Sequence, residues 1–197
     1  MTVPGVFSTS FEPDTDAVGT AVLVPGRGYP PMAPLLFFSG LALLQHGWRV
    51  EHHWWDPPEH ESDAKTTAWV RSEVADELPS SGRALVVAKS LGTLAASLAA
   101  ERRLPAIWLT PLLDMPEVVD AIAANPAAQL LVGGVADPLW DRGVARSLES
   151  ETCRVVEIAD ADHVMLVSGD VIRGVENHVE VVRAVDDWLA HLDPNDR

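Results

Sequence analysis

The chain has 197 residues, a length typical of one domain that buries roughly 70% of the surface exposed by the unfolded chain. Hydrophobic residues make up 47% of it, whereas 29 acidic side chains against 14 basic ones leave a formal net charge of −15. This balance argues against a nucleic-acid-binding protein, which needs a clustered basic face to displace counterions.

Apolar runs of the kind found in buried strands alternate with helix-period segments along the chain. In chain order the pattern predicts strand 17–24, helix 33–46, strand 48–55, helix 63–78, strand 83–88, helix 91–102, strand 106–109, helix 116–124, strand 129–133, helix 141–148 and strand 154–158. A further, antiparallel strand is expected within 5–11, and Gly47 is the expected end of the first helix.

The last predicted helix has an apolar residue at every third or fourth position, which indicates one stripe facing a sheet. The stripe consists of Val175, Val179, Val182, Val185, Leu189 and Leu192. Strands that alternate with helices form a mostly parallel sheet with right-handed crossovers. We therefore predict an α/β protein, a three-layer sandwich whose sheet of about six to seven strands carries helices on both faces. Residues 1–197 are expected to form a single domain without a separate lid.

Three features indicate where the protein resides. The single cysteine, Cys153, excludes an internal disulfide framework and suits a reducing compartment. The first residues lack the basic start and apolar block of a signal peptide. The longest helix-like apolar stretch, 35–44, is interrupted by Ser39 and Gly40 and is far shorter than the ~20 residues of a membrane span. We expect a cytoplasmic protein with no membrane partner.

A serine between an apolar run and a helix of small residues is the most informative feature of the chain. Segment 86–92 is typical of a strand end, a turn at Ser90 and a helix start, which together make a nucleophile elbow. Such an elbow needs small residues two positions before and after the serine, and Ala88 and Gly92 meet that demand. In the alternative interpretation, Ser90 is only the N-cap of the helix.

An acid and a histidine follow later strands, Asp137 after 129–133 and His163 after 154–158. The carboxyl ends of parallel strands share one edge of a sheet, so both side chains can meet Ser90 there. His163 would take the serine proton and return it to the leaving group, while Asp137 orients the imidazole. The alternatives are Asp114 as the acid, Asp137 as the start of an Asp-Pro turn, and His163 as a loop histidine bonded to Asp160 or Asp162.

Three motifs resemble those of the α/β-hydrolase family, and the resemblance covers about residues 17–192. They are the elbow Ala88-Lys89-Ser90-Leu91-Gly92, the acid loop Val135-Ala136-Asp137-Pro138 and the histidine loop Ala161-Asp162-His163. The chain is similar to small, lidless members close to the dienelactone-hydrolase-like and short carboxylesterase branches. This resemblance implies that an acyl bond is split through a covalent acyl-enzyme without a cofactor. Ala88 in place of glycine and Lys89 beside the serine depart from the family pattern, and Lys89 leaves the substrate branch open.

Two backbone N–H groups are expected to stabilise the negative charge that develops during such a reaction. One belongs to Leu91, which follows the serine at the helix N-terminus, where the helix dipole favours an anion. The other belongs to Arg27 or Gly28 in the turn 26–28, whose glycines let the backbone approach a ligand closely. The alternative is an ordinary tight turn.

Large side chains near the predicted strand ends are candidates for substrate contacts. They are Tyr29, Trp108, Trp140 and Met165. The alternative for each is a place in the core, where most large aromatic residues lie. The histidines and carboxylates of 52–61 suggest a metal site, but His52 and His53 are neighbours in a strand and point to opposite faces. We predict no metal and no cofactor.

The sequence therefore predicts a serine hydrolase that cleaves a small-molecule ester or thioester of a small carboxylic acid. Ser90 is the predicted nucleophile, His163 the base and acid, and Asp137 the orienting carboxylate. The alternatives are a non-catalytic ligand-binding protein on the same scaffold and an acyl transferase that uses the same serine. Fold alone does not separate them, because function depends on the site.

Overall fold

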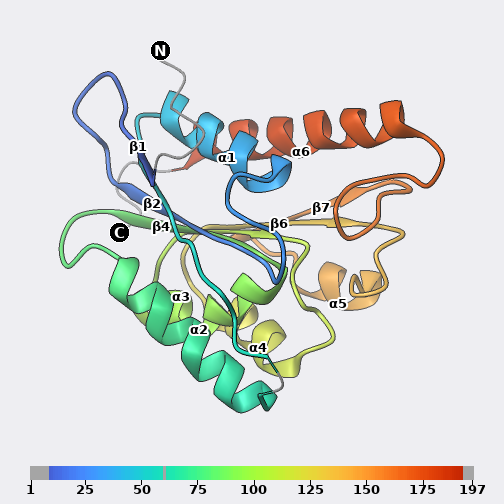
Figure 1. Cartoon of the computed structure of the whole chain (residues 1–197), viewed down its shortest axis with the longest axis horizontal. Coiled ribbons are helices and arrows are strands. Elements are labelled where there is room, and N and C mark those ends of the chain that lie inside the picture. The colour runs from blue at the N-terminus through green and yellow to red at the C-terminus, as the bar shows by residue number, and fades with distance from the viewer. Residues whose placement is uncertain (1–8, 60, 193–197) are drawn as a thin grey trace.

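The structure is a computed structural model that describes residues 9–59 and 61–192. In this part of the chain seven strands form one sheet, in the order β1-β3-β2-β4-β5-β6-β7 (Figure 1). The strands are β1 (Ser10–Phe11), β2 (Thr20–Val24), β3 (Arg49–His52), β4 (Ala84–Lys89), β5 (Ala106–Leu109), β6 (Gln129–Gly134) and β7 (Cys153–Ile158). Every neighbouring pair is parallel except β1 with β3, which confirms the mostly parallel sheet with one antiparallel strand. Residues 5–8 of the predicted first strand lie outside the described residues.

Helices cover both faces of the sheet, as predicted (Figure 1). One face carries α1 (Pro34–Gln45) and α6 (Val171–His191), and the other carries α2 (Asp63–Glu77), α3 (Ala96–Arg102), α4 (Pro116–Ala124) and α5 (Arg142–Ser147). Successive side chains of the central strand β4 point alternately to the two helix layers. Leu85 and Val87 pack with α1 and α6, whereas Val86 and Ala88 pack on the opposite face. The two cores meet only through the sheet, which gives the three-layer sandwich.

The segment after β4 differs from the predicted α-helix 91–102. It begins as a 3₁₀ helix, Ser90–Ala95, and continues as α3. The tighter turn accompanies close packing against β2, because a Cβ at Gly92 would lie 2.8 Å from the carbonyl oxygens of Val24 and Pro25. A 3₁₀ turn at a helix N-terminus is common, and here it brings the serine turn next to the end of β2.

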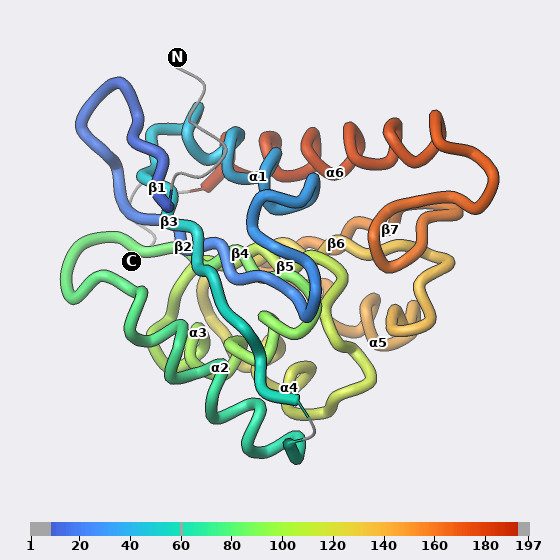
Figure 2. Tube along the Cα trace, viewed as in Figure 1, coloured from blue at the N-terminus to red at the C-terminus, as the bar shows by residue number. Residues whose placement is uncertain are grey.

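The predicted strand 48–55 is also shorter in the structure, where β3 ends at His52. The N–H of His53 donates to the carbonyl of Leu23 at 3.1 Å, and the chain then leaves the sheet. Trp55 packs instead on Trp69 of α2, with ring centroids 5.0 Å apart. Segment 54–57 therefore runs across the end of the sheet rather than within it (Figure 2).

The apolar stripe predicted for the last helix is correct only for its second half. Val185 and Leu189 of α6 are buried, but Val175 and Val179 are 58% and 43% exposed. Gly174, Asn177 and Val181 occupy the buried side of the first half instead. The buried side of the first half differs from the predicted one because α6 packs there against the loop after β7. Gly174 faces Leu166 of that loop, and the buried amide of Asn177 donates to the carbonyl of Met165. No helix among the described residues has the length and apolar character needed to cross a membrane.

Candidate active site

Ser90 lies in a sharp turn between β4 and the 3₁₀ helix that follows it. Its φ of 50° lies in the left-handed region, which non-glycine residues adopt only under local strain. The turn raises the side chain above the carboxyl end of a central strand, next to a helix N-terminus. This is the backbone geometry of a nucleophile elbow, and a plain helix N-cap would have extended φ and ψ angles instead.

The imidazole of His163 lies between Ser90 and Asp137. Its Nε2 is 2.9 Å from the Ser90 Oγ, and its Nδ1 is 2.7 Å from Oδ2 of Asp137. An ionised carboxylate only accepts hydrogen bonds, so Nδ1–H donates to Asp137 and Nε2 is left to accept from the serine hydroxyl. The carboxylate side chain is fully buried, and its Oδ1 accepts the N–H of Leu139 at 2.9 Å. The structure thus brings together the three side chains predicted for the site.

The alternative partners of the histidine do not contact it. Asp162 shapes the loop instead, because its Oδ1 accepts the N–H groups of Val164 and Leu166 at 2.9 and 2.8 Å. Asp160 adopts a φ of 58° in the turn after β7. Asp114 is exposed after β5 and forms no hydrogen bond with His163. Of the acids weighed from the sequence, Asp137 alone bonds the imidazole.

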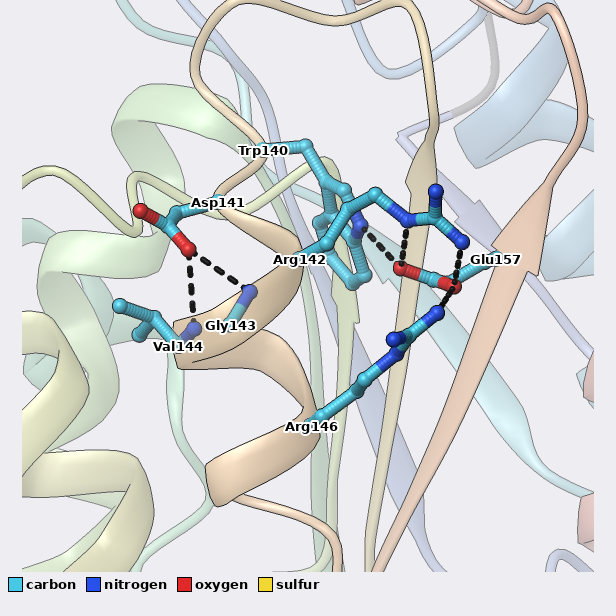
Figure 3. A network of polar contacts seen from close by, with 7 residues as sticks. All are labelled: Trp140, Asp141, Arg142, Gly143, Val144, Arg146 and Glu157. Atoms are coloured by element: carbon cyan, nitrogen blue, oxygen red, sulfur yellow. Dashed lines mark hydrogen bonds and ion pairs between the residues drawn. The ribbon is translucent and has the colours of Figure 1, made fainter.

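The segment that follows Asp137 is fixed to β7 by a network around Glu157 (Figure 3). Arg142 forms two hydrogen bonds with the Glu157 carboxylate, at 3.1 Å each, and Arg146 adds another at 3.2 Å. The indole N–H of Trp140 donates to the same carboxylate at 3.2 Å. These contacts, led by the hydrogen bond from Arg142, lower the pKa of Glu157 to about 2. The network braces α5 and, through it, the loop that presents Asp137.

Three of the four predicted substrate contacts lie in the core, which contradicts those predictions. Trp108 and Met165 have no exposed surface, and Trp140 is 5% exposed. The indole N–H of Trp108 donates to Gln129 at 2.9 Å, and the ring of Trp140 fills the space where Gly133 lacks a side chain. These residues were predicted from their positions near strand ends alone. A position near a strand end does not determine whether the side chain points into the core or toward the edge of the sheet where Ser90 lies.

The turn at residues 26–29, which we call the 26–29 turn, stands beside the elbow. Gly26 and Tyr29 exchange backbone hydrogen bonds of 3.2 and 3.3 Å, which leaves Arg27 and Gly28 exposed at the tip. A Cβ on Gly26 would lie 3.3 Å from the Cβ of Ser90, so the turn packs directly against the serine. Leu91, on the other side, is the second residue of the 3₁₀ helix, where an N–H has no partner within the helix. Leu91 follows Ser90 directly, and Gly26 brings the turn that carries Arg27 and Gly28 against the serine.

A cleft of about 230 Å³ opens next to the 26–29 turn. Tyr29 lines it together with Gly26, Gly28 and two tryptophans of the segment after β3, Trp54 and Trp55. Trp54 is 49% exposed although it is a large apolar residue. Neither tryptophan was predicted to line a site, because both fall inside the predicted strand 48–55. The Asp-Pro-Pro that follows them is a signal that the strand ends earlier.

His52, the last residue of β3, and His53, which follows it, point to opposite faces of the sheet, as predicted. The ring of His52 packs edge to face with the ring of Phe11, with ring centroids 4.2 Å apart. His53 faces α2, where its nitrogens lie 3.1 Å from a Glu77 oxygen and 3.4 Å from a Glu73 oxygen. His60 of the same cluster lies outside the described residues.

Comparison with known proteins shows the fold. No protein-family model matches the chain, and no curated protein matches its sequence. Est1E from Butyrivibrio proteoclasticus is similar in structure, with a TM-score of 0.68 and 14% identity over 92% of each chain. A lidless α/β serine hydrolase from Xanthomonas campestris matches with a TM-score of 0.62 and 15% identity, over 92% of this chain and 87% of that one. Dienelactone hydrolase from Anabaena variabilis matches with a TM-score of 0.62 and 18% identity, over 93% and 90%. The chain has the α/β-hydrolase fold, as its three motifs predicted.

Proposed function

We propose that this protein is a serine hydrolase that cleaves an ester or thioester of a small carboxylic acid through an acyl-enzyme on Ser90. The observation that carries the proposal is the chain of contacts from Ser90 Oγ to His163 Nε2, at 2.9 Å, and from His163 Nδ1 to Asp137, at 2.7 Å. A hydroxyl is a weak nucleophile unless a base stands within hydrogen-bond distance of it. The similar solved structures named above include a lidless serine hydrolase and a dienelactone hydrolase, which supports the same class of reaction.

The reaction proceeds in two halves. Ser90 Oγ attacks the carbonyl carbon of the substrate while its proton passes to His163 Nε2. The resulting oxyanion accepts hydrogen bonds from the N–H of Leu91 and from Arg27 or Gly28 in the 26–29 turn. As the carbonyl re-forms, the bond to the alcohol or thiol breaks, and His163 gives that leaving group its proton. A water molecule then attacks the acyl-enzyme, again with His163 as the base, and releases the acid and free Ser90.

The cleft lined by Tyr29, Trp54 and Trp55, which we call the aromatic cleft, is the proposed binding site for the substrate. Gly26 lines this cleft and also packs against Ser90, so a group bound in the cleft lies beside the carbonyl that Ser90 attacks. Tyr29 and the two tryptophans favour a flat apolar group. A solved structure of Est1E, which this chain resembles with a TM-score of 0.69, contains ferulic acid, itself an aromatic carboxylic acid. Aryl esters therefore belong in the first substrate panel.

The first experiment is intact-mass spectrometry after incubation with a small fluorophosphonate, with wild type and Ser90→Ala side by side. We expect one adduct on the wild-type protein and none on the variant. Turnover of a responsive ester or thioester is expected to fall about 10⁶-fold in Ser90→Ala, because the covalent step is lost. A folded wild-type protein that gives no adduct would contradict the proposal and favour a ligand-binding scaffold. Product analysis with added alcohols or amines separates hydrolysis from acyl transfer.

A further inference from the structure

Lys89, the residue before Ser90, is buried without a carboxylate partner. It is 2% exposed, and no carboxylate among the described residues lies within ion-pair distance of its Nζ, although Asp137 and Asp162 act on its charge from farther away. Its contact is the ring of Tyr29, whose centroid lies 4.7 Å from Nζ. Burial of an ammonium group opposes folding unless its charge is compensated, and a cation–π contact compensates it only in part. Because the buried ammonium group of Lys89 opposes folding, we expect its role to lie in the function of the protein.

The stem of Lys89 runs along the 26–29 turn. A Cβ on Gly26 would lie 3.0 Å from the Lys89 Cδ and 3.3 Å from its carbonyl oxygen, so no larger residue fits there without displacement. Tyr29, at the other end of the turn, is tied to α1, since its hydroxyl accepts the N–H of Leu35 at 3.0 Å. The turn is therefore held between the strand that carries Ser90 and the first turn of α1.

We infer that Lys89 is a positioning residue for the hydrolysis proposed above, on which this inference rests. Its ammonium group holds the ring of Tyr29, and through that ring it fixes the 26–29 turn against Ser90. The turn presents the N–H groups of Arg27 and Gly28, which the reaction needs at a fixed distance from the developing oxyanion. Loss of the charge or of the ring would loosen the turn and leave Ser90, His163 and Asp137 in place.

The charge of Lys89 can be removed by alkaline pH. Desolvation lowers its pKa to about 8, although Asp137 and Asp162 act in the opposite direction. Tyr29, the ring that faces it, has its pKa raised to about 12 by desolvation and stays neutral over the same range. The other ionisable or charged side chains on this side are His163, which is bonded to Asp137, Arg27 at the tip of the turn, and Asp56 in the cleft that Tyr29 lines. The wild-type protein should therefore lose kcat as the pH rises through about 8.

Lys89→Met and Lys89→Arg separate the effect of the charge of Lys89 from that of its aliphatic chain. For a responsive ester at pH 7 we expect Lys89→Met to lower kcat by about 10–100-fold with little change in KM, because oxyanion donors act in the transition state. Its thermal midpoint should equal or exceed that of the wild type, since an apolar side chain replaces a buried charge. Lys89→Arg keeps a cation at high pH, so it should retain activity and lose the alkaline decline. Tyr29→Leu should lower kcat by a similar factor for methyl acetate, a substrate too small to need the aromatic cleft, and should in addition raise KM for aryl esters, because Tyr29 lines that cleft. The double variant should lower kcat no further than either single variant.

Lys65 provides the matched control, because the sequence has only two lysines. It is exposed on α2 and pairs with Glu61 at 2.8 Å, so Lys65→Met should keep the wild-type rate and pH profile. Selective ¹³C labelling of lysine gives two Cε signals, and the Lys89→Met spectrum assigns them for a direct titration. A folded Lys89→Met with wild-type kcat and an unchanged alkaline limb would overturn the inference. Failure of the wild type to bind the fluorophosphonate would instead overturn the proposed function.

Discussion

Asp137 fixes the tautomer of the histidine, and its second oxygen makes that role testable. Because Oδ1 accepts the N–H of Leu139 at 2.9 Å, an asparagine there would place its oxygen on that N–H and its NH₂ toward His163 Nδ1. Nδ1 would then have to accept, which puts the proton on Nε2, where it faces the serine hydroxyl. In Asp137→Asn we expect kcat to fall by about 10⁴-fold at nearly constant KM.

Asp114→Asn is the control for that experiment, since Asp114 was the alternative acid from the sequence and is exposed after β5. It should retain the wild-type rate. Equal losses in Asp114→Asn and Asp137→Asn would mean that the histidine takes a different partner during turnover. A circular dichroism spectrum and a thermal melt establish that both variants are folded.

Trp54 tests the aromatic cleft. Replacement by alanine removes the exposed ring from one wall, so KM for an aryl ester should rise about 10-fold while that for methyl acetate changes little. Phenyl acetate and methyl benzoate, compared side by side, show whether the leaving group or the acyl group occupies the cleft. Phe38→Ala is the matched control, because Phe38 is similarly exposed, at 43%, but lies on α1 beside a different cleft. A uniform rise in KM for all esters would contradict a specific aryl site.

At the scale of elements, the Glu157 network joins β7 to α5. A carboxylate whose pKa is depressed in the folded protein stabilises the fold above its unfolded pKa, and that contribution is lost as the pH falls through its folded pKa. For Glu157 the window runs from its ordinary value of 4.5 down to about 2. The contribution should be about 1–2 kcal/mol after allowance for solvent screening of the two arginines, which are 50% and 61% exposed.

Urea unfolding of wild type and Glu157→Gln at several pH values measures this contribution. The variant should be less stable at pH 7, and the difference should shrink as the pH falls below 4.5 and vanish only below about pH 2, where Glu157 becomes neutral in the folded protein as well. Glu101→Gln is the control, since Glu101 also bonds an arginine through both oxygens but is 61% exposed. Its effect should stay below about 0.5 kcal/mol. A difference for Glu157→Gln that is as large near pH 2 as at pH 7 would assign the effect to packing instead of charge.

A feature of the fold or site could be predicted from the sequence where it depends on local residues, and not where it depends on residues distant in the chain. Strands buried on both sides, such as β5 with Ala106–Leu109, are continuous apolar runs, and their predicted bounds match the structure. The contacts among Ser90, His163 and Asp137 were predictable because the carboxyl ends of parallel strands meet at one edge. The directions of Trp108 and Met165 were not, because a residue near a strand end can point to the edge or into a layer. That choice depends on neighbours distant in sequence, such as Gln129 for Trp108.

At the scale of the whole molecule, charge is the dominant feature. With 29 acidic and 14 basic residues, the folded protein opposes its own compactness by electrostatic repulsion, which salt screens. We expect the thermal midpoint to rise by a few degrees, about 2–4 °C for each 1 kcal/mol gained, between 10 mM and 500 mM sodium chloride. A fall would mean that exposed ion pairs such as Arg71–Glu101 and Arg154–Asp187 outweigh the net repulsion. Differential scanning calorimetry at pH 7 decides between them.

The left-handed turn at Ser90 sets stability against activity in this chain. Glycine adopts a φ of 50° without strain, whereas serine adopts it at the expense of the folded state. A change from serine to glycine at this position would therefore relax the backbone and remove the hydroxyl in a single step. In the proposed hydrolase, loss of the nucleophile would relieve this backbone strain, so selection for the proposed reaction, and not for the backbone conformation, keeps a serine at this turn.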